Sequence, residues 1–576
     1  MIMQKKWIIK PEASHELIDE LSTAINVSKP VANLLIQRGI TTFDAAKKFF
    51  RPNLHDLYDP FLMKDMHLAV SRLEMAINNQ EGVMVYGDYD VDGTTSVSMM
   101  YSFLRNKLKN LHYYIPDRYH EGYGISIKGI DTAKEKGCSL IIALDCGIKA
   151  VQKVDYANEK GIDFIICDHH EPGDEIPAAV AVLDPKRPDC NYPFKELSAC
   201  GVGFKFIQAI AAQNNIPFYK IEHYLDLVVV SIASDIVPIV DENRIMAYYG
   251  LKRLNSKPRI GIKAILDVAE IQPGNLKIND LVFKVGPRIN AAGRMEQGRY
   301  SVDLLVCKEK EHAAAMAGKI DEDNKERKWF DGNITKEALA MIEENAELQA
   351  RKSTVLYNPE WHKGVIGIVA SRIIDYYYKP TIILTRSNGF VTGSARSVSR
   401  FNLYQAIEQC QDLLENFGGH MYAAGLTLKE ENVEPFIQCF EKAVREMITP
   451  ESEVQKIEVD EVIQLNQINQ KFFKVLEQFE PFGPGNMTPI FVAKNVIDTG
   501  YAQCVGSDSE HLKLNLSDEN SKNSYPAIAF RQSVHFDAIV NSQPFDVCFN
   551  LEENNFRGKT SIQIKVRDIA PSKKVN

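Results

Sequence analysis

The chain has 576 residues, more than one hydrophobic core usually supports, so we expect three or four domains of roughly 100 to 200 residues each. Its composition, 45% hydrophobic and 25% charged, is that of an ordinary globular protein, and no run of about 18 apolar residues could span a bilayer. The net charge of −9 gives no overall electrostatic reason to expect a nucleic-acid ligand, so any such site must depend on local clusters of basic residues.

The start of the sequence and its cysteines indicate the compartment. The opening stretch "MIMQKKWIIKPEASHELIDE" turns acidic and polar before any long apolar run, which is not typical of a signal peptide. Ten cysteines are scattered without a CxxC pair, which argues against a zinc ribbon or a disulfide framework. We therefore expect a cytoplasmic protein with reduced thiols.

Residues 80 to 190 alternate short apolar runs with helical stretches. The runs are "VMVYGD", "HYYIPD", "LIIALDCG", "DFIICDHH" and "VAVLDPK". Near-continuous apolar strands separated by helices predict βαβ units and a parallel sheet that is covered on both faces. The fold class that we expect here is α/β, with a doubly wound parallel sheet.

Polar side chains follow three of these predicted strands. Asp88, Asp90 and Asp92 come after the first run, Asp145 after the third, and the triplet Asp168, His169 and His170 after the fourth. Ligands of open α/β sheets bind outside the carboxyl ends of the strands, so we expect these side chains to converge.

The sequence outside the catalytic domain predicts four further regions. The stretch "EHAAAMAGKIDEDNKERKWF" predicts a long helix between two lobes, and a second, smaller α/β unit follows from about residue 352. In that unit, "FNLYQAIEQCQDLLENFGGH" has helical spacing, with Gly418 and Gly419 as its stop. Alternating runs such as "HLKLNL" and "SIQIKV" predict a small all-β barrel or sandwich at the end. The expected limits are 1–75 for an N-terminal helical segment that packs on the core, 76–308 for a catalytic domain, 309–350 for a linker helix, 351–450 for a substrate-binding domain and 451–576 for an OB-type domain.

The motif "GDYDVDGTTS" places three aspartates at alternating positions between a strand and a helix. A calcium loop of the EF-hand type begins in a similar way, but its twelfth position should be Glu and is Met99 here. Together with Asp145 and the triplet, these residues would repel one another strongly without bound cations. A mixed set of histidine and carboxylate ligands suits Mn²⁺ or Mg²⁺ better than Zn²⁺. The residues therefore predict a two-metal phosphoesterase, in which cations about 3.5 to 4 Å apart activate a water and stabilise the leaving oxygen.

A family resemblance rests on several of these strings in their order. "GDYDVDGTTS", "ALDCG", "CDHHEP" and "SIASDIVP" resemble the successive motifs of the DHH phosphoesterase superfamily. The further strings "GPRINAAGRM", "WHKGVIGIVASRI", "SARS", "FGGHMYAAGL" and "FEPFGPGNMTPIF" are similar to the RecJ family of single-strand-specific exonucleases within it. The likeness runs from about residue 25 to 570. It implies a DHH catalytic domain, a DHH-associated substrate-binding domain and a C-terminal OB fold.

The resemblance also implies a role for each residue of the cluster. His170 would contact the scissile phosphate or orient the attacking water, Asp168 would fix the histidine's tautomer from outside the ligand set, and Asp90 would belong to the catalytic group. The implied ligands of two Mn²⁺ or Mg²⁺ ions are Asp88, Asp90, Asp92, Asp145, His169 and Asp235.

Members of this family degrade single-stranded DNA from its 5′ end, in DNA repair and recombination, and need a pocket for the terminal phosphate. Arginine suits it because its planar fork binds phosphate bidentately. The resemblance implies that this pocket uses Arg118, Ser394 and Arg396. It implies that the chain near the scissile bond is held by Arg288, Asn290 and His420. Two simpler interpretations stay open: Arg288 as a structural ion-pair residue, and His420 as the cap of a helix end.

Alternative functions are weighed against the same residues. A small-substrate DHH phosphodiesterase, acting on oligonucleotides or cyclic dinucleotides, would be shorter and would lack the β-rich segment. A non-catalytic scaffold that binds single strands would have lost metal motifs, which are intact here. OB folds grip single strands by stacking, but Phe479, Phe482 and Phe491 are more typical of core residues. The resemblance suggests a helicase and a single-strand-binding protein as partners, and we expect a monomer.

Overall fold

The computed structural model describes residues 5–118, 120–295, 298–521, 523–541, 543–556 and 559–572. The chain forms two compact units, each built from separate stretches of sequence. Unit 1 comprises residues 1–12, 325–468 and 489–576, and unit 2 comprises residues 13–324 and 469–488. Within the described ranges, no helix combines the length and the apolar character needed to cross a membrane.

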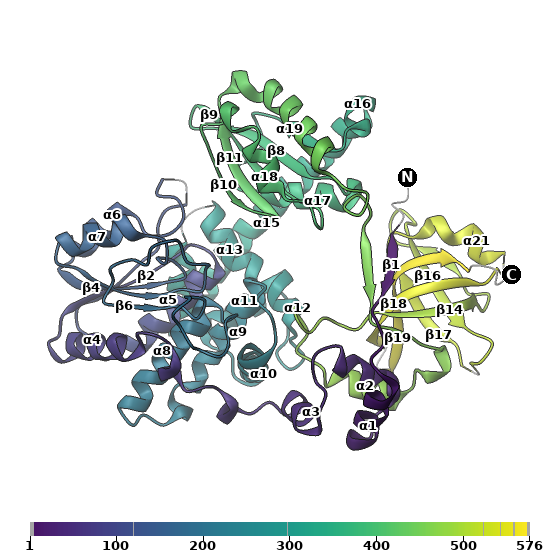
Figure 1. Cartoon of the computed structure of the whole chain (residues 1–576), viewed down its shortest axis with the longest axis horizontal. Coiled ribbons are helices and arrows are strands. Elements are labelled where there is room, and N and C mark those ends of the chain that lie inside the picture. The colour runs from purple at the N-terminus through teal and green to yellow at the C-terminus, as the bar shows by residue number, and fades with distance from the viewer. Residues whose placement is uncertain are drawn as a thin grey trace. The chain divides into compact units, whose positions relative to one another are not determined.

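Unit 2 is built around a five-stranded parallel sheet, as the alternating pattern predicted. Its strand order is β3-β2-β4-β5-β6, and β2, β4 and β6 are labelled in Figure 1. The strands are β2 (Gly82–Gly87), β3 (Leu111–Tyr114), β4 (Cys138–Leu144), β5 (Asp163–Cys167) and β6 (Ala181–Leu183). The helices that follow the first three of these strands are α5 (Val91–Leu104), α6 (Ile127–Glu135) and α7 (Val151–Glu159).

Both faces of this sheet are covered, which explains why its strands are apolar throughout. In β2, Val83 and Val85 belong to one hydrophobic cluster, while Met84 and Tyr86 belong to another. Successive side chains of a strand point to opposite faces, so a strand buried on both sides cannot carry polar residues at alternate positions. In the buried strands β2, β5 and β6, polar side chains are therefore found only at or beyond the strand ends, whereas the edge strand β3 is half-buried and contains His112.

Further helices complete unit 2. They are α1 (His15–Ile25), α2 (Lys29–Ile36), α3 (Phe43–Phe50), α4 (Met66–Asn78), α8 (Ala199–Gln213), α9 (Leu225–Ser234), α10 (Asp241–Ser256), α11 (Ile260–Val268), α12 (Ile278–Asp280), α13 (Gly286–Met295), α14 (Arg299–Val306) and α20 (Gln470–Glu477). The last of them lies in the stretch Asn469–Thr488, which the sequence placed within the OB-type region. The domain limits drawn from the sequence stay predictions.

The long helix predicted after residue 310 is present as α15 (Lys310–Glu343). Ala313, Ala317 and Ile320 are buried in the core of unit 2, so the apolar spacing at its start marks the face that packs. The short helix α16 (Ala346–Ala350) follows it.

The smaller α/β part of unit 1 has a five-stranded sheet in the order β10-β11-β9-β8-β7. Its strands are β7 (Thr354–Tyr357), β8 (Thr381–Ser387), β9 (Phe390–Arg396), β10 (Asn416–His420) and β11 (Ala423–Leu428), and its helices include α17 (Ile366–Tyr377), α18 (Leu403–Glu408) and α19 (Val433–Met447). The prediction of one helix up to Phe417 was wrong. Only α18 is α-helical, and Gly418 and Gly419 lie in β10 because antiparallel pairing with β11 overrides the local spacing.

The C-terminal region of unit 1 is the predicted OB-type domain. Its strands are β12 (Lys456–Val459), β13 (Glu461–Val462), β14 (Phe491–Asp498), β15 (Gln503–Val505), β16 (His511–Ser517), β17 (Tyr525–Ala529), β18 (Phe545–Phe556) and β19 (Lys559–Pro571), with α21 (Phe536–Val540) between β17 and β18. β14 pairs with both β18 and β16, so β14, β18, β19, β17 and β16 form a closed ring of the size of an OB fold. At the chain start, β1 (Lys6–Ile9) pairs in parallel with β12. Phe479 and Phe491 are buried, as expected of core residues, and Phe482 is half-buried.

Candidate active site

The predicted metal ligands meet at the carboxyl ends of the parallel strands of unit 2. Asp88 follows β2, Asp145 follows β4, and the triplet from Asp168 to His170 follows β5. Two carboxylates come from helices instead: Asp92 lies in the first turn of α5, and Asp235 caps the C-terminus of α9. Residues spread over some 150 positions of the sequence therefore share one site.

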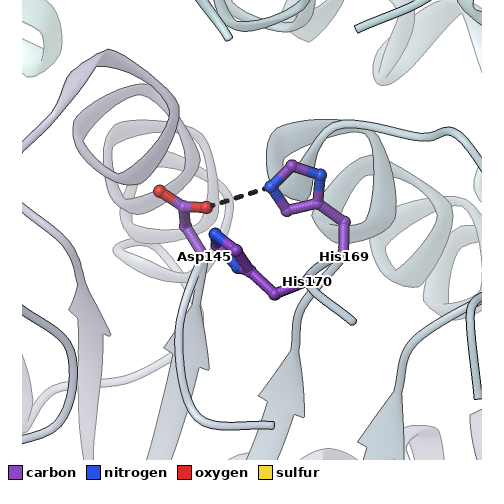
Figure 2. Close-up of side chains that lie close together, drawn as sticks. All are labelled: Asp145, His169 and His170. Atoms are coloured by element: carbon purple, nitrogen blue, oxygen red, sulfur yellow. Dashed lines mark ion pairs between the residues drawn. The ribbon is translucent and has the colours of Figure 1, made fainter. Parts of the chain in front are cut away.

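His169 lies at the centre of this cluster. Its Nε2 atom is 3.4 Å from Asp145 Oδ1 (Figure 2). The same atom is 3.6 Å from Asp235 Oδ2 and 3.8 Å from Asp92 Oδ2. In three groups, ligand atoms lie within 4.8 Å of one another; these are Asp88 with Asp90 and Asp145, Asp92 with His169 and Asp235, and Asp145 with His169 and His170. Asp145 and His169 each belong to two groups, so the arrangement suits neighbouring ions with shared ligands.

Local backbone geometry brings the aspartates of "GDYDVDGTTS" and Asp145 into place. Asp90 is the N-cap of α5, and its Oδ1 accepts a hydrogen bond from Gly93 N at 3.0 Å. A Cβ atom on Gly93 would lie 2.3 Å from Asp88 O, so only glycine permits this close turn. Asp145 itself has φ 64°, a left-handed conformation that is uncommon outside glycine and is often found at functional sites.

Several buried atoms of the cluster lack protein partners. Among the described residues, these are Asp88 Oδ2, Asp145 Oδ2 and both ring nitrogens of His169. Buried polar groups normally have hydrogen bonds, because leaving one unsatisfied costs about 1–3 kcal/mol. Four unsatisfied atoms in one cluster fit the coordination of a cation, and their oxygen and imidazole chemistry suits Mn²⁺ or Mg²⁺.

The pKa values of the carboxyl groups reflect the same crowding. Burial, reinforced by neighbouring aspartates, raises the pKa of Asp88 and of Asp235 to about 8. Burial and the charges of Asp90, Asp92 and Asp88 raise the pKa of Asp145 well above its usual value. Burial lowers the pKa of His169, which keeps its imidazole neutral and able to act as a ligand. Without cations, the cluster therefore holds protons that bound metal would displace.

Asp168 differs from the other carboxylates because both of its oxygens have hydrogen-bond partners. Its Oδ2 accepts from Ile148 N at 2.9 Å, and its Oδ1 accepts from His169 N at 2.8 Å and lies 2.7 Å from His170 Nδ1. Burial alone would raise the pKa of Asp168, but the hydrogen bond and charge of His170 outweigh it, so the pKa falls to about 2. For His170, burial alone would lower the pKa, and Asp168 instead raises it to about 9. Asp168 thus orients His170 and keeps it protonated at neutral pH.

Two residues of this region, Tyr123 and Asp184, were not among the candidate site residues predicted from the sequence. The hydroxyl of Tyr123 lies 3.1 Å from His170 Nε2 and donates to Asp145 O at 3.2 Å. Asp184 follows β6, is fully buried and has one carboxylate oxygen without a partner among the described residues. Tyr123 lies five residues after Arg118, but a lone tyrosine in a loop gives no signal in the sequence. Asp184 could have been found, since it follows the fifth strand as Asp145 follows the third.

The candidate substrate residues of unit 2 have different surroundings. The Arg118 guanidinium stacks over the Tyr89 ring at 5.0 Å, and both line a cavity of about 460 Å³. Arg288 is buried, and its Nε donates to Asp321 Oδ1 at 2.9 Å, which matches the ion-pair interpretation in this conformation. Asn290 is half-buried in α13.

In unit 1, Ser394, Arg396 and His420 lie close together on the sheet. Arg396 and His420 are both register partners of Ala423, so the three adjacent strands bring them to the same level. Arg396 Nη1 donates to Ser394 Oγ at 3.1 Å. A Cβ on Gly367, in the first turn of α17, would lie 2.8 Å from Ser394 Oγ and 2.9 Å from Arg396 Nη2. An arginine and a serine thus lie against a helix N-terminus, a combination that favours anions. His420 ends a strand and is exposed, so it is not the cap of a helix.

Family models match three parts of the chain. Residues 82–232 match the N-terminal domain of the DHH family, residues 351–446 match the DHHA1 domain, and residues 459–568 match the RecJ OB domain.

Individual proteins match over nearly the whole length. The single-stranded-DNA-specific exonuclease RecJ of Bacillus subtilis is 35% identical over 569 residues, which cover 98% of this chain and 71% of that protein. The crystal structure of RecJ from Thermus thermophilus in complex with Mn²⁺ matches 99% of this chain and 80% of its own, with a TM-score of 0.84 and 25% identity. The structure of the Thermus protein in complex with Mg²⁺ matches 99% of this chain and 79% of its own, with a TM-score of 0.78 and 24% identity.

Proposed function

The chain belongs to the RecJ family of single-stranded-DNA-specific exonucleases within the DHH phosphoesterases, and from that membership we propose how its residues hydrolyse DNA. It is a hydrolase that removes nucleotides from single-stranded DNA with Mn²⁺ or Mg²⁺ as cofactor. We further propose that digestion proceeds from the 5′ end, in DNA repair and recombination. The observation that carries the metal-dependent hydrolysis is the group of unsatisfied ligand atoms at the strand ends of unit 2.

Two ions would be held by the carboxylates and the central histidine. The proposed ligands are Asp88, Asp90, Asp92, Asp145, His169 and Asp235. Bound ions would activate a water and stabilise the leaving oxygen of the phosphodiester. Asp92 reaches the cluster although its carboxylate also accepts from Ala199 N at 2.8 Å and Cys200 N at 2.9 Å, so it is the most firmly positioned of the set.

His170 and Asp168 act on the substrate side. His170 is protonated at neutral pH because Asp168 raises its pKa to about 9, so it can donate to a phosphate oxygen. Asp168 holds the ring through Nδ1 and leaves Nε2 directed at Tyr123. The Tyr123 hydroxyl therefore fixes the direction of the His170 donor before the phosphate arrives.

The remaining polar residues are proposed to bind the DNA strand. Ser394 and Arg396, beside the N-terminus of α17, would bind the terminal 5′ phosphate. Arg118 would contribute a phosphate ligand, since its guanidinium lines a cavity and stacks on an aromatic ring. Asn290, His420 and, after release from Asp321, Arg288 would hold the chain near the scissile bond.

The family match favours the exonuclease over the alternatives. The OB-type ring, matched by the RecJ OB domain, has no use in cleaving a small cyclic substrate, and the metal cluster has no use in a purely binding protein. We also propose a cytoplasmic monomer that acts on strands exposed by a helicase or covered by a single-strand-binding protein.

One assay tests the proposed polarity and strand preference. A 5′-phosphorylated single strand labelled at its 3′ end should shorten in the presence of Mn²⁺, with the label retained on progressively shorter products. The same sequence as a blunt duplex should persist. Early release of the 3′ label would reverse the polarity, and digestion of dinucleotides alone would favour a small-substrate phosphodiesterase.

A further inference from the structure

The metal ligand Asp235 is supported only through its backbone. Among the described residues, no protein hydrogen bond holds its carboxylate, whereas that of Asp92 accepts bonds from two backbone N–H groups and from Ser231 Oγ. Asp235 caps α9, and Ile236 follows it with φ 60°. A β-branched residue is rarely found in this left-handed conformation, and such strain persists only where surrounding structure fixes it. The position of the Asp235 carboxylate therefore depends on what holds the loop from Asp235 to Val240.

That loop packs against residues almost 250 positions further along the chain. Pro484 O accepts a hydrogen bond from Ile239 N at 2.7 Å. A Cβ atom on Gly483 would lie 2.5 Å from Ile239 Cδ1, and one on Gly485 would lie 2.9 Å from Val240 Cγ1. The glycines thus leave room for the Ile239 and Val240 side chains against the turn from Phe479 to Met487, here called the clasp turn.

The clasp turn is itself rigidly built. Gly483 and Asn486 exchange two backbone hydrogen bonds, of 3.0 and 2.8 Å. The buried side chain of Asn486 donates to Phe479 O at 2.8 Å and Pro481 O at 3.0 Å, and its Oδ1 accepts from Arg38 Nε at 3.0 Å. These hydrogen bonds fix the conformation of the clasp turn, so it can act as a rigid support for the Asp235 loop.

Arg244 anchors the clasp turn to the helix that follows the Asp235 loop. This buried arginine of α10 donates to Phe479 O at 2.8 Å and Glu480 O at 3.1 Å, and its guanidinium lies 3.8 Å from the centre of the Phe49 ring. Because α10 begins directly after Val240, the Asp235 loop continues into this helix. The clasp turn therefore contacts both the loop, through Ile239, and the helix, through Arg244. Asn243 adds a hydrogen bond to Pro238 O at 2.9 Å.

We propose that the clasp turn is a positioning element for metal binding: through Gly483, Pro484 and Asn486 it fixes the loop that presents Asp235. The proposal rests on the proposed function, since it takes Asp235 as a ligand. It assigns a role to the string "FGPGN", which lies between elements of the OB-type region in sequence but belongs to unit 2 in the structure. Groups that orient metal ligands from outside typically change metal affinity by about 10–100-fold when altered.

The test is direct Mn²⁺ binding to the full chain without DNA, by titration calorimetry or by the electron paramagnetic resonance of free Mn²⁺. Gly483→Ala places a methyl group against Ile239, and we expect the weakest bound ion to lose about tenfold in affinity. Ile239→Ala removes the opposing Cδ1 and Cγ1 atoms, so the double variant should regain most of the affinity. Ile239→Val, a milder change, should weaken binding a few-fold, and it replaces Gly483→Ala if that chain does not fold.

A matched control lies at the other end of the same stretch. Asn469 caps α20 through Phe472 N at 3.0 Å, so Asn469→Ala should lower the melting temperature without changing Mn²⁺ affinity. Unchanged affinity in Gly483→Ala and Ile239→Val would overturn the positioning role. An equal loss in Asn469→Ala would also overturn it, because general destabilisation would then explain the result. A wild-type chain that binds no Mn²⁺ would overturn the metal site as well, whereas failure of DNA digestion with normal Mn²⁺ binding would affect only the proposed function.

Discussion

The proposed metal cluster of unit 2 and the proposed phosphate-binding face of unit 1, formed by Ser394 and Arg396, are both polar, but they differ in how many of their polar atoms have hydrogen-bond partners within the protein. In unit 2, Asp88 Oδ2, Asp145 Oδ2 and the His169 nitrogens are buried without hydrogen bonds among the described residues. In unit 1, Arg396 already donates to Ser394 Oγ and to Ala395 O. The first region is incomplete without its ligand, and the second is preformed. Ligand removal should therefore destabilise unit 2 and leave unit 1 largely unaffected.

The largest effect that we expect from a single substitution is that of Asp145→Asn in the metal cluster. Loss of a carboxylate shared by two ligand groups should reduce the rate of DNA hydrolysis on the order of a thousandfold, since a catalytic metal contributes several kcal/mol to transition-state stabilisation. The metal-free variant should melt at a higher temperature than metal-free wild type, because the wild-type chain must take up a proton at Asp145 when it folds near neutral pH, and the Asn side chain is neutral without one. Calorimetry with and without Mn²⁺ measures both states, and a lower metal-free melting temperature would contradict the strain assigned to the cluster.

The pH dependence of stability sharpens the same contrast. Asp88 and Asp235 have pKa values raised to about 8 in the folded protein without metal, so the folded state binds more protons than the unfolded state. Its free energy of unfolding should consequently fall as pH rises from about 4 to about 8. Saturating Mn²⁺ should remove this decline. Urea denaturation at pH 5 and pH 8 measures it, and equal stability at both pH values without metal would contradict the assignment.

In unit 1, Arg396→Ala should remove the preference for a 5′-phosphorylated strand. We expect kcat/KM for that strand to fall by about 10–100-fold, which corresponds to the free energy of one charge-assisted hydrogen bond. Strands with a 5′ hydroxyl should be digested at nearly the wild-type rate. The exposed Arg400, four residues further on, provides the matched control, because Arg400→Ala should leave the preference intact. An unaltered preference in Arg396→Ala would remove this face from phosphate binding.

The smallest expected effect concerns Tyr123→Phe. The change removes the hydroxyl that lies 3.1 Å from His170 Nε2 and leaves the ring in place. One such hydrogen bond is worth about 0.5–1.5 kcal/mol, so kcat should fall roughly two- to tenfold with unchanged Mn²⁺ affinity. A loss of Mn²⁺ affinity instead would show that Tyr123 supports the ligands rather than His170.

Much of unit 2 could be predicted because its pattern leaves little choice. Strands buried on both faces must be apolar, so the polar residues that follow them stand out, and parallel strands bring their carboxyl ends to one edge. The sequence could not show that Phe479 and Asn486 belong to unit 2, because their partners Phe49 and Arg38 are more than 400 residues away. The helix expected up to Phe417 was wrong for a related reason, since pairing with a strand that comes later in the chain decides its conformation.

The position of the clasp turn in the sequence also has a consequence for protein synthesis. Unit 2 includes residues up to Asn324 and then residues from Asn469 to Thr488. The ribosome must add 164 residues (488 − 324) after Asn324 before unit 2 can close, which takes roughly 10 to 30 s at elongation rates of about 5–20 residues per second. A nascent chain would thus carry every metal ligand well before the turn that supports Asp235 is made. Full metal affinity would then be reached only after Thr488 has been synthesised.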